Sequence, residues 1–423
     1  MALTCKVIVA HPFQQHSFKT AAAILRANCL FRYVTTVYDK KGSWTRKAMF
    51  FLRGEDKERG GNRKSNELKN ESVIQFCEIH GLLLLLLQRI DKKGFIYTKC
   101  YLSLLKRFNK KLVKYSIKNN IDAIIVYDVV SADYIQRIKK EKGFKVKIIL
   151  DMSAPYYNYM VEQFHHDSEL YNYDMNNGLN KPIYSYRNEY SRIELEGADA
   201  FFVASEFTKK SVLTYRKDAK VYICNYGVED FANNTQSNVD CSVDKNHIHI
   251  VFVGAASFQK GAHHLINAIN QINDNRIELS MYGTYDPNSS IFQQKRANVE
   301  FHGHVPREKM KDAYKNADIL VVPSLADGYG FVIPEGLAYA TAVVASKNAG
   351  ASFLVKDGVN GYVFDPFDEN ALVGIIAKLI NNTHLIEEMK KNAILSINNV
   401  TWESYNKQVK SALYDVLNLE LDE

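Results

Sequence analysis

The chain has 423 residues, of which 46% are hydrophobic and 24% are charged, and its mean hydropathy is −0.26. This balance excludes disordered, collagen-like and small disulfide-rich proteins, and the length predicts two or three domains. The net charge of +7 is unevenly distributed, because residues 1–120 hold 24 Lys and Arg against 8 Asp and Glu, while the rest of the chain holds 30 against 39. Such asymmetry indicates that one face of the molecule meets a polyanion or an anionic lipid surface.

The six cysteines show no C-x-x-C pair or other metal-ligand spacing, and their positions do not suggest a disulfide framework. The N-terminal segment MALTCKVIVAHPF runs directly into a strand-like stretch and lacks the apolar core and cleavage site of a signal peptide. The leucine run at residues 82–87 is far shorter than the about 20 apolar residues that cross a bilayer. We therefore expect a cytoplasmic protein without a transmembrane helix.

Short β-branched runs alternate with stretches of helical periodicity along the first half of the chain, which favours a parallel, doubly wound sheet. These runs lie at residues 6–10, 33–38, 123–127, 146–150, 200–204 and 221–224. Residues 231–246 are polar and aperiodic, and the alternation restarts beyond them. The second set of runs lies at residues 249–253, 277–282, 299–302, 318–322, 342–345 and 361–364. The pattern predicts an α/β protein with two Rossmann-like domains, at residues 1–230 and 247–400, joined by a linker at 231–246.

Residues 40–120 interrupt the first domain as a long basic and aromatic insertion that holds the leucine run. Their apolar positions between residues 95 and 115 approximate helical spacing. Two interpretations remain open: a core helix with a solvated basic face, or an element that lies on an anionic membrane surface or docks the acceptor. No nucleic-acid reading module accompanies the charge, so nucleic acid is not an expected partner.

The segment VFVGAASFQKG at residues 251–261 ends a strand and precedes an apolar-periodic helix. Gly254 permits close approach of backbone to a ligand, and a helix that begins near Gly261 presents unpaired N–H groups to phosphate. Lys260 would add a positive charge. A glycine turn before a helix is also an ordinary feature of Rossmann domains, so the segment alone does not define a site.

The segment ADILVVPSLADGYGFVIPEG at residues 317–336 ends a second strand at Pro323 and Ser324. The loop that follows lies where doubly wound sheets bind ligands, at the carboxyl ends of the strands. Glu335, eight positions after Asp327, could accept hydrogen bonds from both hydroxyls of a ribose. It could equally be a carboxylate that is favoured at a helix N-terminus.

Taken together, these segments resemble the nucleotide-sugar domain of family 4 retaining glycosyltransferases, which have the GT-B fold. The matching motifs are Gly254 with Lys260 and Gly261, residues 317–324, residues 327–335, residues 348–350 and residues 360–363. Residues 198–207 and 225–228 resemble the two segments that lead into the interdomain linker of that family. Residues 401–423, which contain Trp402 and Tyr405, resemble the final helix that crosses back to the N-terminal domain.

The resemblance implies that Lys260 neutralises the donor diphosphate, that Glu335 holds the ribose, and that Asp327 faces the donor sugar. The other donor-binding residues that it implies are Gly254, Gly261, Ser324, Gly328, Tyr329, Gly330, Phe331 and Val332. It also implies retention at the anomeric carbon, no obligatory cofactor, and a nucleotide diphosphate sugar as donor. No D-x-D-like motif is placed to hold a divalent ion, so we expect no catalytic metal.

The chain departs from the family at several positions. Ala255 stands where the family has an arginine, and the first domain has HPFQQHS in place of a glycine-rich loop. His11 and His16 in that segment are candidates to line the acceptor cleft. Asp151 stands where the family has a histidine, and we place it with Lys260 and Asp327 among the candidate catalytic residues. For His11, His16 and Asp151 a purely structural role is the alternative.

The principal hypothesis is a retaining hexosyltransferase that transfers sugar to a saccharide or lipid-linked acceptor, in bacterial surface polysaccharide or glycolipid synthesis. It would work in the cytoplasm, peripherally on the inner face of the plasma membrane. A non-catalytic glycosyltransferase-like subunit that binds nucleotide or glycan is the alternative, and a GT-B epimerase of the sugar nucleotide is a third reading that explains the basic segment poorly.

Overall fold

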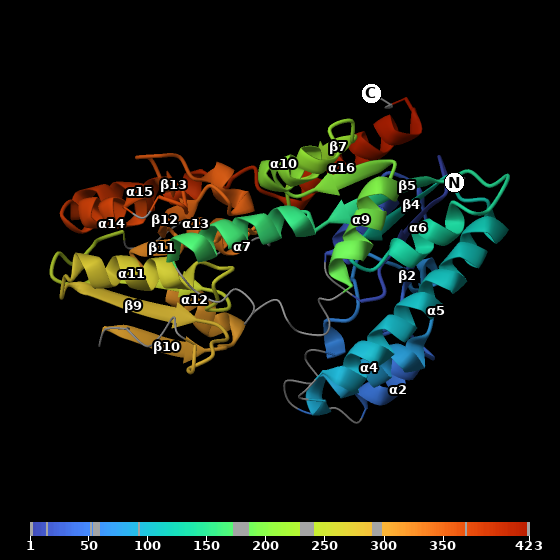
Figure 1. The fold of residues 1–423 in the computed structure, drawn as a ribbon, viewed down its shortest axis with the longest axis horizontal. Coiled ribbons are helices and arrows are strands. Elements are labelled where there is room, and N and C mark those ends of the chain that lie inside the picture. The colour runs from blue at the N-terminus through green and yellow to red at the C-terminus, as the bar shows by residue number, and fades with distance from the viewer. Residues whose placement is uncertain are drawn as a thin grey trace.

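The computed structural model describes residues 3–13, 16–50, 53, 60–91, 94–171, 186–228, 241–289, 298–368 and 370–420. Within them the chain forms two parallel sheets, of seven and six strands, and helices flank both (Figure 1). The predicted α/β architecture with two doubly wound sheets is therefore confirmed. We call residues 3–228 together with the last helix the N-lobe, and residues 241–400 the C-lobe.

The N-lobe is built on the seven-stranded sheet. In spatial order its strands are β3 (Val73–Gln75), β2 (Leu30–Thr35), β1 (Val7–Ala10), β4 (Ala123–Tyr127), β5 (Lys147–Met152), β6 (Ala200–Val203) and β7 (Val221–Ile223). Its helices are α1 (Ser17–Arg26), α2 (Trp44–Met49), η1 (Asn70–Ser72), α4 (Glu78–Ile90), α5 (Phe95–Asn119), α6 (Ala132–Ile138), α7 (Tyr157–Tyr171), α9 (Arg187–Gly197) and α10 (Glu206–Tyr215). The central strands are apolar and fully buried because helices cover both faces of the sheet.

The C-lobe is built on the six-stranded sheet. In spatial order its strands are β10 (Val299–Gly303), β9 (Ile277–Tyr282), β8 (Ile248–Val253), β11 (Ile319–Val322), β12 (Ala342–Ser346) and β13 (Gly361–Phe364). Its helices are α11 (Ala262–Ile272), α12 (Arg307–Lys315), α13 (Val332–Ala338), η5 (Gly350–Leu354), α14 (Ala371–Ile380) and α15 (Thr383–Leu395). The chain then continues into α16 (Trp402–Leu417), which packs against α1 and β6 of the N-lobe.

Each sheet reverses its winding direction beside its first strand. In the N-lobe β1 pairs with β2 on one side and with β4 on the other, and in the C-lobe β8 pairs with β9 and with β11. Ligands of doubly wound sheets bind at such switch points, beyond the carboxyl ends of the strands. The fold therefore places the expected ligand sites at the segments that follow β1 and β4, and at those that follow β8 and β11.

Residues 40–120, expected as an irregular insertion, contribute directly to the N-lobe. They supply the edge strand β3, and α5 makes the long connection back to β4. The inner face of α5 is buried, with Leu104, Leu105 and Phe108 in the core. Among the described residues, no helix combines the length and the apolar character needed to cross a membrane. The expected linker at 231–246 falls largely outside the described residues, which resume at Cys241.

The two lobes contact each other along α7 and at the loop after β11. The helix α7 lies beside the C-lobe (Figure 1). Its side chains Met160, Gln163 and Asp167 contact the C-lobe, at helical spacing on one face. At the other end of the chain, the α16 residue Tyr405 lies with its hydroxyl 2.8 Å from that of Thr20 on α1. Since α16 belongs to the N-lobe, the segment that connects α15 to α16 also joins the two lobes covalently.

Candidate active site

The turn after β8 places Lys260 and Gly261 against the end of β11. Gly261 has a φ of +68° and stands just before α11, and a Cβ at this position would lie 1.8 Å from the carbonyl oxygen of Pro323. Only glycine fits such a close approach. The carbonyl of Gln259 accepts a hydrogen bond from the N–H of Leu325 at 3.0 Å. These contacts hold the segments 251–261 and 317–336 together at the switch point of the C-lobe.

Lys260 and Asp327 form an ion pair at this junction. The Lys260 ammonium lies 2.5 Å from Oδ2 of Asp327, and both side chains keep partial access to solvent. Asp327 is itself fixed through its backbone, because its N–H donates to the carbonyl of Asn348 and its carbonyl accepts from the N–H of Gly350. The structure therefore brings together the cation and the carboxylate that the sequence singled out.

Glu335 lies in the first turn of α13, as expected, and is half-buried. Its Oε2 accepts a hydrogen bond of 2.8 Å from the hydroxyl of Tyr314, whose ring stacks on Tyr339. Burial, together with the nearby Glu335 carboxylate, raises the pKa of Tyr314 well above its usual value, so this phenol stays protonated and donates. The carboxylate is thus oriented by a neighbour before any ligand arrives.

The loop between Asp327 and α13 is pressed against the N-lobe. The carbonyl of Gly328 accepts hydrogen bonds from the hydroxyls of Ser205 at 2.7 Å and Thr208 at 3.3 Å. A Cβ on Gly328 would lie 2.1 Å from the carbonyl oxygen of Ser153, in the segment after β5. The lobes are therefore closed on each other at this loop.

The remaining candidate donor-site residues differ in their burial and contacts. Tyr329 is buried, and its hydroxyl donates to the carbonyl of Tyr226 at 2.5 Å. Phe331 is exposed and stacks on the ring of Tyr226, with the centroids 5.4 Å apart. Val332 is half-buried, and Gly330 takes a φ of +78°. Gly254 takes a φ of +140°, and Ser324 is buried.

Asp151 and His16 meet in the N-lobe. Nε2 of His16 lies 2.9 Å from Oδ1 of Asp151, and Oδ2 of the same carboxylate accepts a 2.9 Å hydrogen bond from Thr20. The ring of Tyr226 covers His16 at a centroid distance of 4.6 Å. Both members of the pair are almost fully buried. The structure brings them together at the carboxyl ends of β1 and β5, where the sequence predicted them.

His11 lines a cavity of about 270 Å³ at the carboxyl ends of β1, β4 and β5. Its Nδ1 accepts a 2.8 Å hydrogen bond from the N–H of Phe13, and its ring packs edge-on against Tyr127. Asp128 and Glu194 line the same cavity. Sequence reasoning missed both acids, because Glu194 reaches the cavity from α9, far along the chain from β4.

Glu194 supports a strained turn in the wall of this cavity. Its carboxylate accepts hydrogen bonds from the N–H of Val129 at 2.7 Å and from the N–H of Ser131 at 2.8 Å. Val129 has a φ of +66°, which is costly for a β-branched residue and is maintained only where the surroundings impose it. Burial raises the pKa of Glu194 to about 8, and burial also raises the pKa of Asp128.

Comparison with known proteins adds to this geometry. Residues 237–396 match the family model described as "Glycosyl transferases group 1", which is less than half of the chain. A glycosyltransferase of Methanocaldococcus jannaschii, itself uncharacterized, is 30% identical over 154 residues, which are 36% of this chain and 44% of that protein. The lipopolysaccharide 1,2-N-acetylglucosaminetransferase of Salmonella typhimurium is 24% identical over 274 residues, which are 58% of this chain and 71% of that protein.

Solved structures resemble nearly the whole chain, and two of them serve as examples. A sucrose-phosphate synthase from Thermosynechococcus elongatus superposes with a TM-score of 0.64 at 16% identity, covering 98% of this chain and 99% of that one. HepE of Anabaena, solved with UDP and glucose, superposes with a TM-score of 0.59 at 16% identity, covering 97% and 100%. These likenesses show the fold, which is the two-lobed GT-B fold that the sequence resemblance implied. Several curated relatives, by contrast, are matched over less than half of their own length.

Proposed function

We propose that the protein is a retaining glycosyltransferase of the family 4 type, which moves a hexose from a nucleotide diphosphate sugar to a saccharide or lipid-linked acceptor. The observation that carries the proposal is the Lys260–Asp327 ion pair at the switch point of the C-lobe. The pair would supply a cation for the diphosphate and, in direct contact with it, a carboxylate for the sugar. The match of residues 237–396 to group 1 glycosyl transferases supports the same reading.

In the proposed reaction the bond between the anomeric carbon and the diphosphate oxygen breaks, and the acceptor hydroxyl oxygen bonds to that carbon on the same face. The acceptor proton passes to the departing phosphate oxygen. Negative charge grows on the diphosphate as it leaves, so the Lys260 ammonium and the N–H groups at the start of α11 stabilise the transition state more than the bound donor. Glu335 would hold the ribose hydroxyls through its carboxylate oxygens.

The proposed acceptor site is the cavity beside His11 in the N-lobe. Its carboxyl groups, Asp128 and Glu194, and its tyrosines offer the mixture of polar and aromatic contacts that suits a saccharide. The buried His16–Asp151 pair lies at the carboxyl ends of β1 and β5, on either side of β4, and would orient the reacting groups rather than transfer a proton to bulk solvent. Closure of the Gly328 loop on Ser205 would exclude water from the reaction.

The test is a panel of nucleotide sugars incubated with the full chain and saccharide or lipid-linked acceptors. The proposal predicts release of a nucleoside diphosphate that depends on the acceptor, and a product with the anomeric configuration of the donor by NMR. Nucleotide binding without release under any pairing would favour the alternative, a subunit that binds without turnover. Inversion of configuration would refute the assignment to the retaining class.

We further propose that the protein docks on the anionic inner face of a bilayer through the α4–α5 surface, which comprises the outward faces of α4 and the start of α5. Ile79, Leu83, Leu86 and Ile90 form an apolar stripe along the outer side of α4, and they are between 45% and 65% exposed. The opposite side of α4, with Leu84 and Leu87, is already buried. An apolar helix face that the described part of the chain leaves exposed suits an interfacial membrane contact.

Charge beside this stripe matches an anionic membrane. The groove between α4 and α5 is lined by Lys99, Arg107, Lys110, Lys111 and Lys114. Each such residue near an anionic surface contributes about 1 kcal/mol to binding at low salt. The protein should sediment together with vesicles that contain phosphatidylglycerol, and it should stay in the supernatant with vesicles of phosphatidylcholine alone. Leu83→Glu should release it, whereas Leu395→Glu, at another exposed leucine, should not; equal binding to both vesicles would end this proposal.

A further inference from the structure

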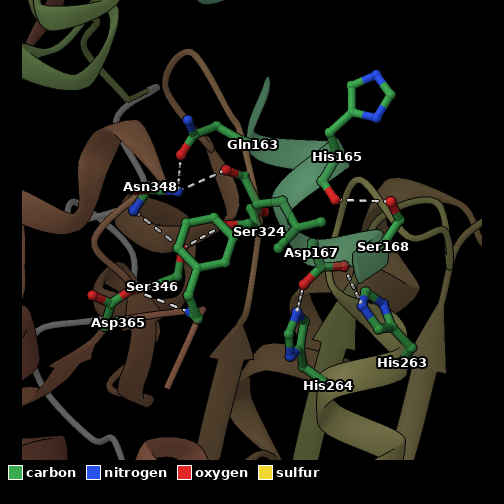
Figure 2. Close-up of polar contacts among 12 residues, drawn as sticks. Gln163, His165, Asp167, Ser168, His263, His264, Ser324, Ser346, Asn348 and Asp365 are labelled. Atoms are coloured by element: carbon green, nitrogen blue, oxygen red, sulfur yellow. Dashed lines mark hydrogen bonds and ion pairs between the residues drawn. The ribbon is translucent and has the colours of Figure 1, made fainter. Parts of the chain in front are cut away.

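Asp167, His263 and His264 form a buried cluster where α7 of the N-lobe meets the first turn of α11 in the C-lobe. Nε2 of His263 lies 2.8 Å from Oδ2 of Asp167, and Nε2 of His264 lies 2.7 Å from Oδ1. Figure 2 shows the carboxylate between the two imidazoles, with one oxygen directed at each ring. The three side chains therefore present their ligand atoms to one another across the boundary between the lobes.

We infer that this cluster is a binding site for a transition-metal ion of the Zn²⁺ type, which joins the two lobes. Two imidazole nitrogens and one carboxylate oxygen are a ligand set that zinc accepts, with a fourth position open to water. The hard cations Mg²⁺ and Ca²⁺ prefer oxygen ligands, so the set discriminates against them. The ligand atoms that the three residues offer all lie within 4.8 Å of one another.

In the present geometry each imidazole contacts a different oxygen of the Asp167 carboxylate. Ligand atoms at about 2.0 to 2.1 Å from a tetrahedral zinc ion are separated by about 3.3 Å. One carboxylate oxygen and one nitrogen of each imidazole, which lie within 4.8 Å of one another, would adopt about this separation around the ion. The hydrogen-bonded cluster is thus the metal-free form of the same arrangement.

Burial strengthens the inference. All three side chains are buried, and an ionised carboxylate in such a place needs compensating positive charge or strong hydrogen bonds. A divalent ion supplies this charge and holds elements from both lobes at once. The neighbouring contact between Asn348 and Gln163, 3.3 Å long and also drawn in Figure 2, joins the same helix α7 to the segment after β12. Metal binding would therefore favour the closed arrangement of the lobes, and it is independent of the proposed transfer reaction.

The experiment uses the full chain, free of any histidine tag, after dialysis against a chelator. Titration with Zn²⁺ should show one equivalent bound with micromolar or tighter affinity, and Co²⁺ should give the visible absorption of a tetrahedral site. Saturating Zn²⁺ should raise the melting temperature, because the ion binds only the folded chain. The variants Asp167→Asn and His264→Ala should each weaken binding at least tenfold.

His247→Ala is the matched control, since His247 also lies beside a carboxylate, that of Glu278, but on the surface and outside the cluster. It should bind Zn²⁺ as the unmodified chain does. Far-ultraviolet circular dichroism establishes that each variant is folded. The inference is wrong if the folded, unmodified chain binds no stoichiometric metal, or if Asp167→Asn binds as tightly as His247→Ala. Neither readout requires glycosyl transfer, so failure here leaves the proposed function standing.

Discussion

The ammonium of Lys260 lies 2.5 Å from the carboxylate of Asp327, although 66 residues separate them along the chain. The contact arises because Gly261 lets the turn after β8 approach the carbonyl of Pro323 at the end of β11. The segments that follow the neighbouring strands β8 and β11 therefore bring Lys260 and Asp327 into contact. The pair is partly exposed, so a phosphate group can reach the ammonium without disruption of the core.

Replacement of Gly261 should be costly, since an added Cβ would overlap the backbone of Pro323 and the φ of +68° is unfavourable for alanine. We expect Gly261→Ala to lower the free energy of unfolding by about 3 kcal/mol or more. Gly303→Ala is the control, because its φ of +66° is similar and no atom of the described residues lies within 4 Å of the added Cβ. It should cost only about 1 to 2 kcal/mol of backbone strain. If urea denaturation shows the same loss of unfolding free energy for Gly261→Ala and Gly303→Ala, the steric argument is contradicted.

Glu335→Gln should weaken the binding of nucleoside diphosphate by about tenfold or more, since a charged hydrogen-bond acceptor contributes roughly 1.5 to 3 kcal/mol. Tyr314→Phe removes the phenol that orients this carboxylate at 2.8 Å and should have a smaller effect. Isothermal titration of the three proteins with the nucleoside diphosphate released by the best donor measures both. If Glu335→Gln binds as tightly as the unmodified chain, the ribose contact is wrong.

Gly328→Ala should push the lobes apart, because the added Cβ would lie 2.1 Å from the carbonyl oxygen of Ser153. The radius of gyration from small-angle scattering should rise, while each lobe remains folded. Ser205→Ala removes the 2.7 Å hydrogen bond to Gly328 together with the N-cap of α10, but it adds no atom between the lobes. It should cost about 1 to 2 kcal/mol of stability, and its radius of gyration should change little. An unchanged radius in Gly328→Ala would show that the closed contact does not hold the lobes.

Stability should depend on pH through Glu194. Burial raises the pKa of this carboxyl group from 4.5 to about 8, so the folded chain holds the proton more tightly than the unfolded chain does. Its contribution to stability is complete below about pH 4.5 and is lost as the pH rises through about 8. The unfolding free energy of the unmodified chain should therefore fall more between pH 6 and pH 9 than that of Glu194→Gln. If the unfolding free energies of the unmodified chain and of Glu194→Gln change with pH in parallel, Glu194 is not the source of the pH dependence.

Most of the fold could be predicted from the sequence because buried parallel strands form continuous β-branched runs. The strand β3 was missed, since Val73–Gln75 is only three residues long and pairs at the edge of the sheet. Without it, residues 40–120 read as an insertion. The long helix α5 was visible only as an approximate periodicity between Phe95 and Tyr115.

The candidate site was predictable where its residues belong to local motifs, as for Lys260, Asp327 and Glu335. Contacts between lobes were not predictable, because they depend on how two separately folded sheets are oriented. Asp167 meets His263 across 96 positions, and nothing in the sequence near either residue indicates the other. Tyr226, which packs against both His16 and Phe331, was missed for the same reason.

The central claim is that Lys260 stabilises the diphosphate as it leaves the sugar. The most direct measurement compares the rate of nucleoside diphosphate release by the unmodified chain, by Lys260→Ala and by Lys347→Ala, which breaks an exposed ion pair with Asp365 in the same lobe. We predict that Lys260→Ala lowers kcat/KM by roughly 10- to 100-fold, as the loss of one charged hydrogen bond requires, and that Lys347→Ala leaves it unchanged. Equal rates for Lys260→Ala and Lys347→Ala would contradict the claim.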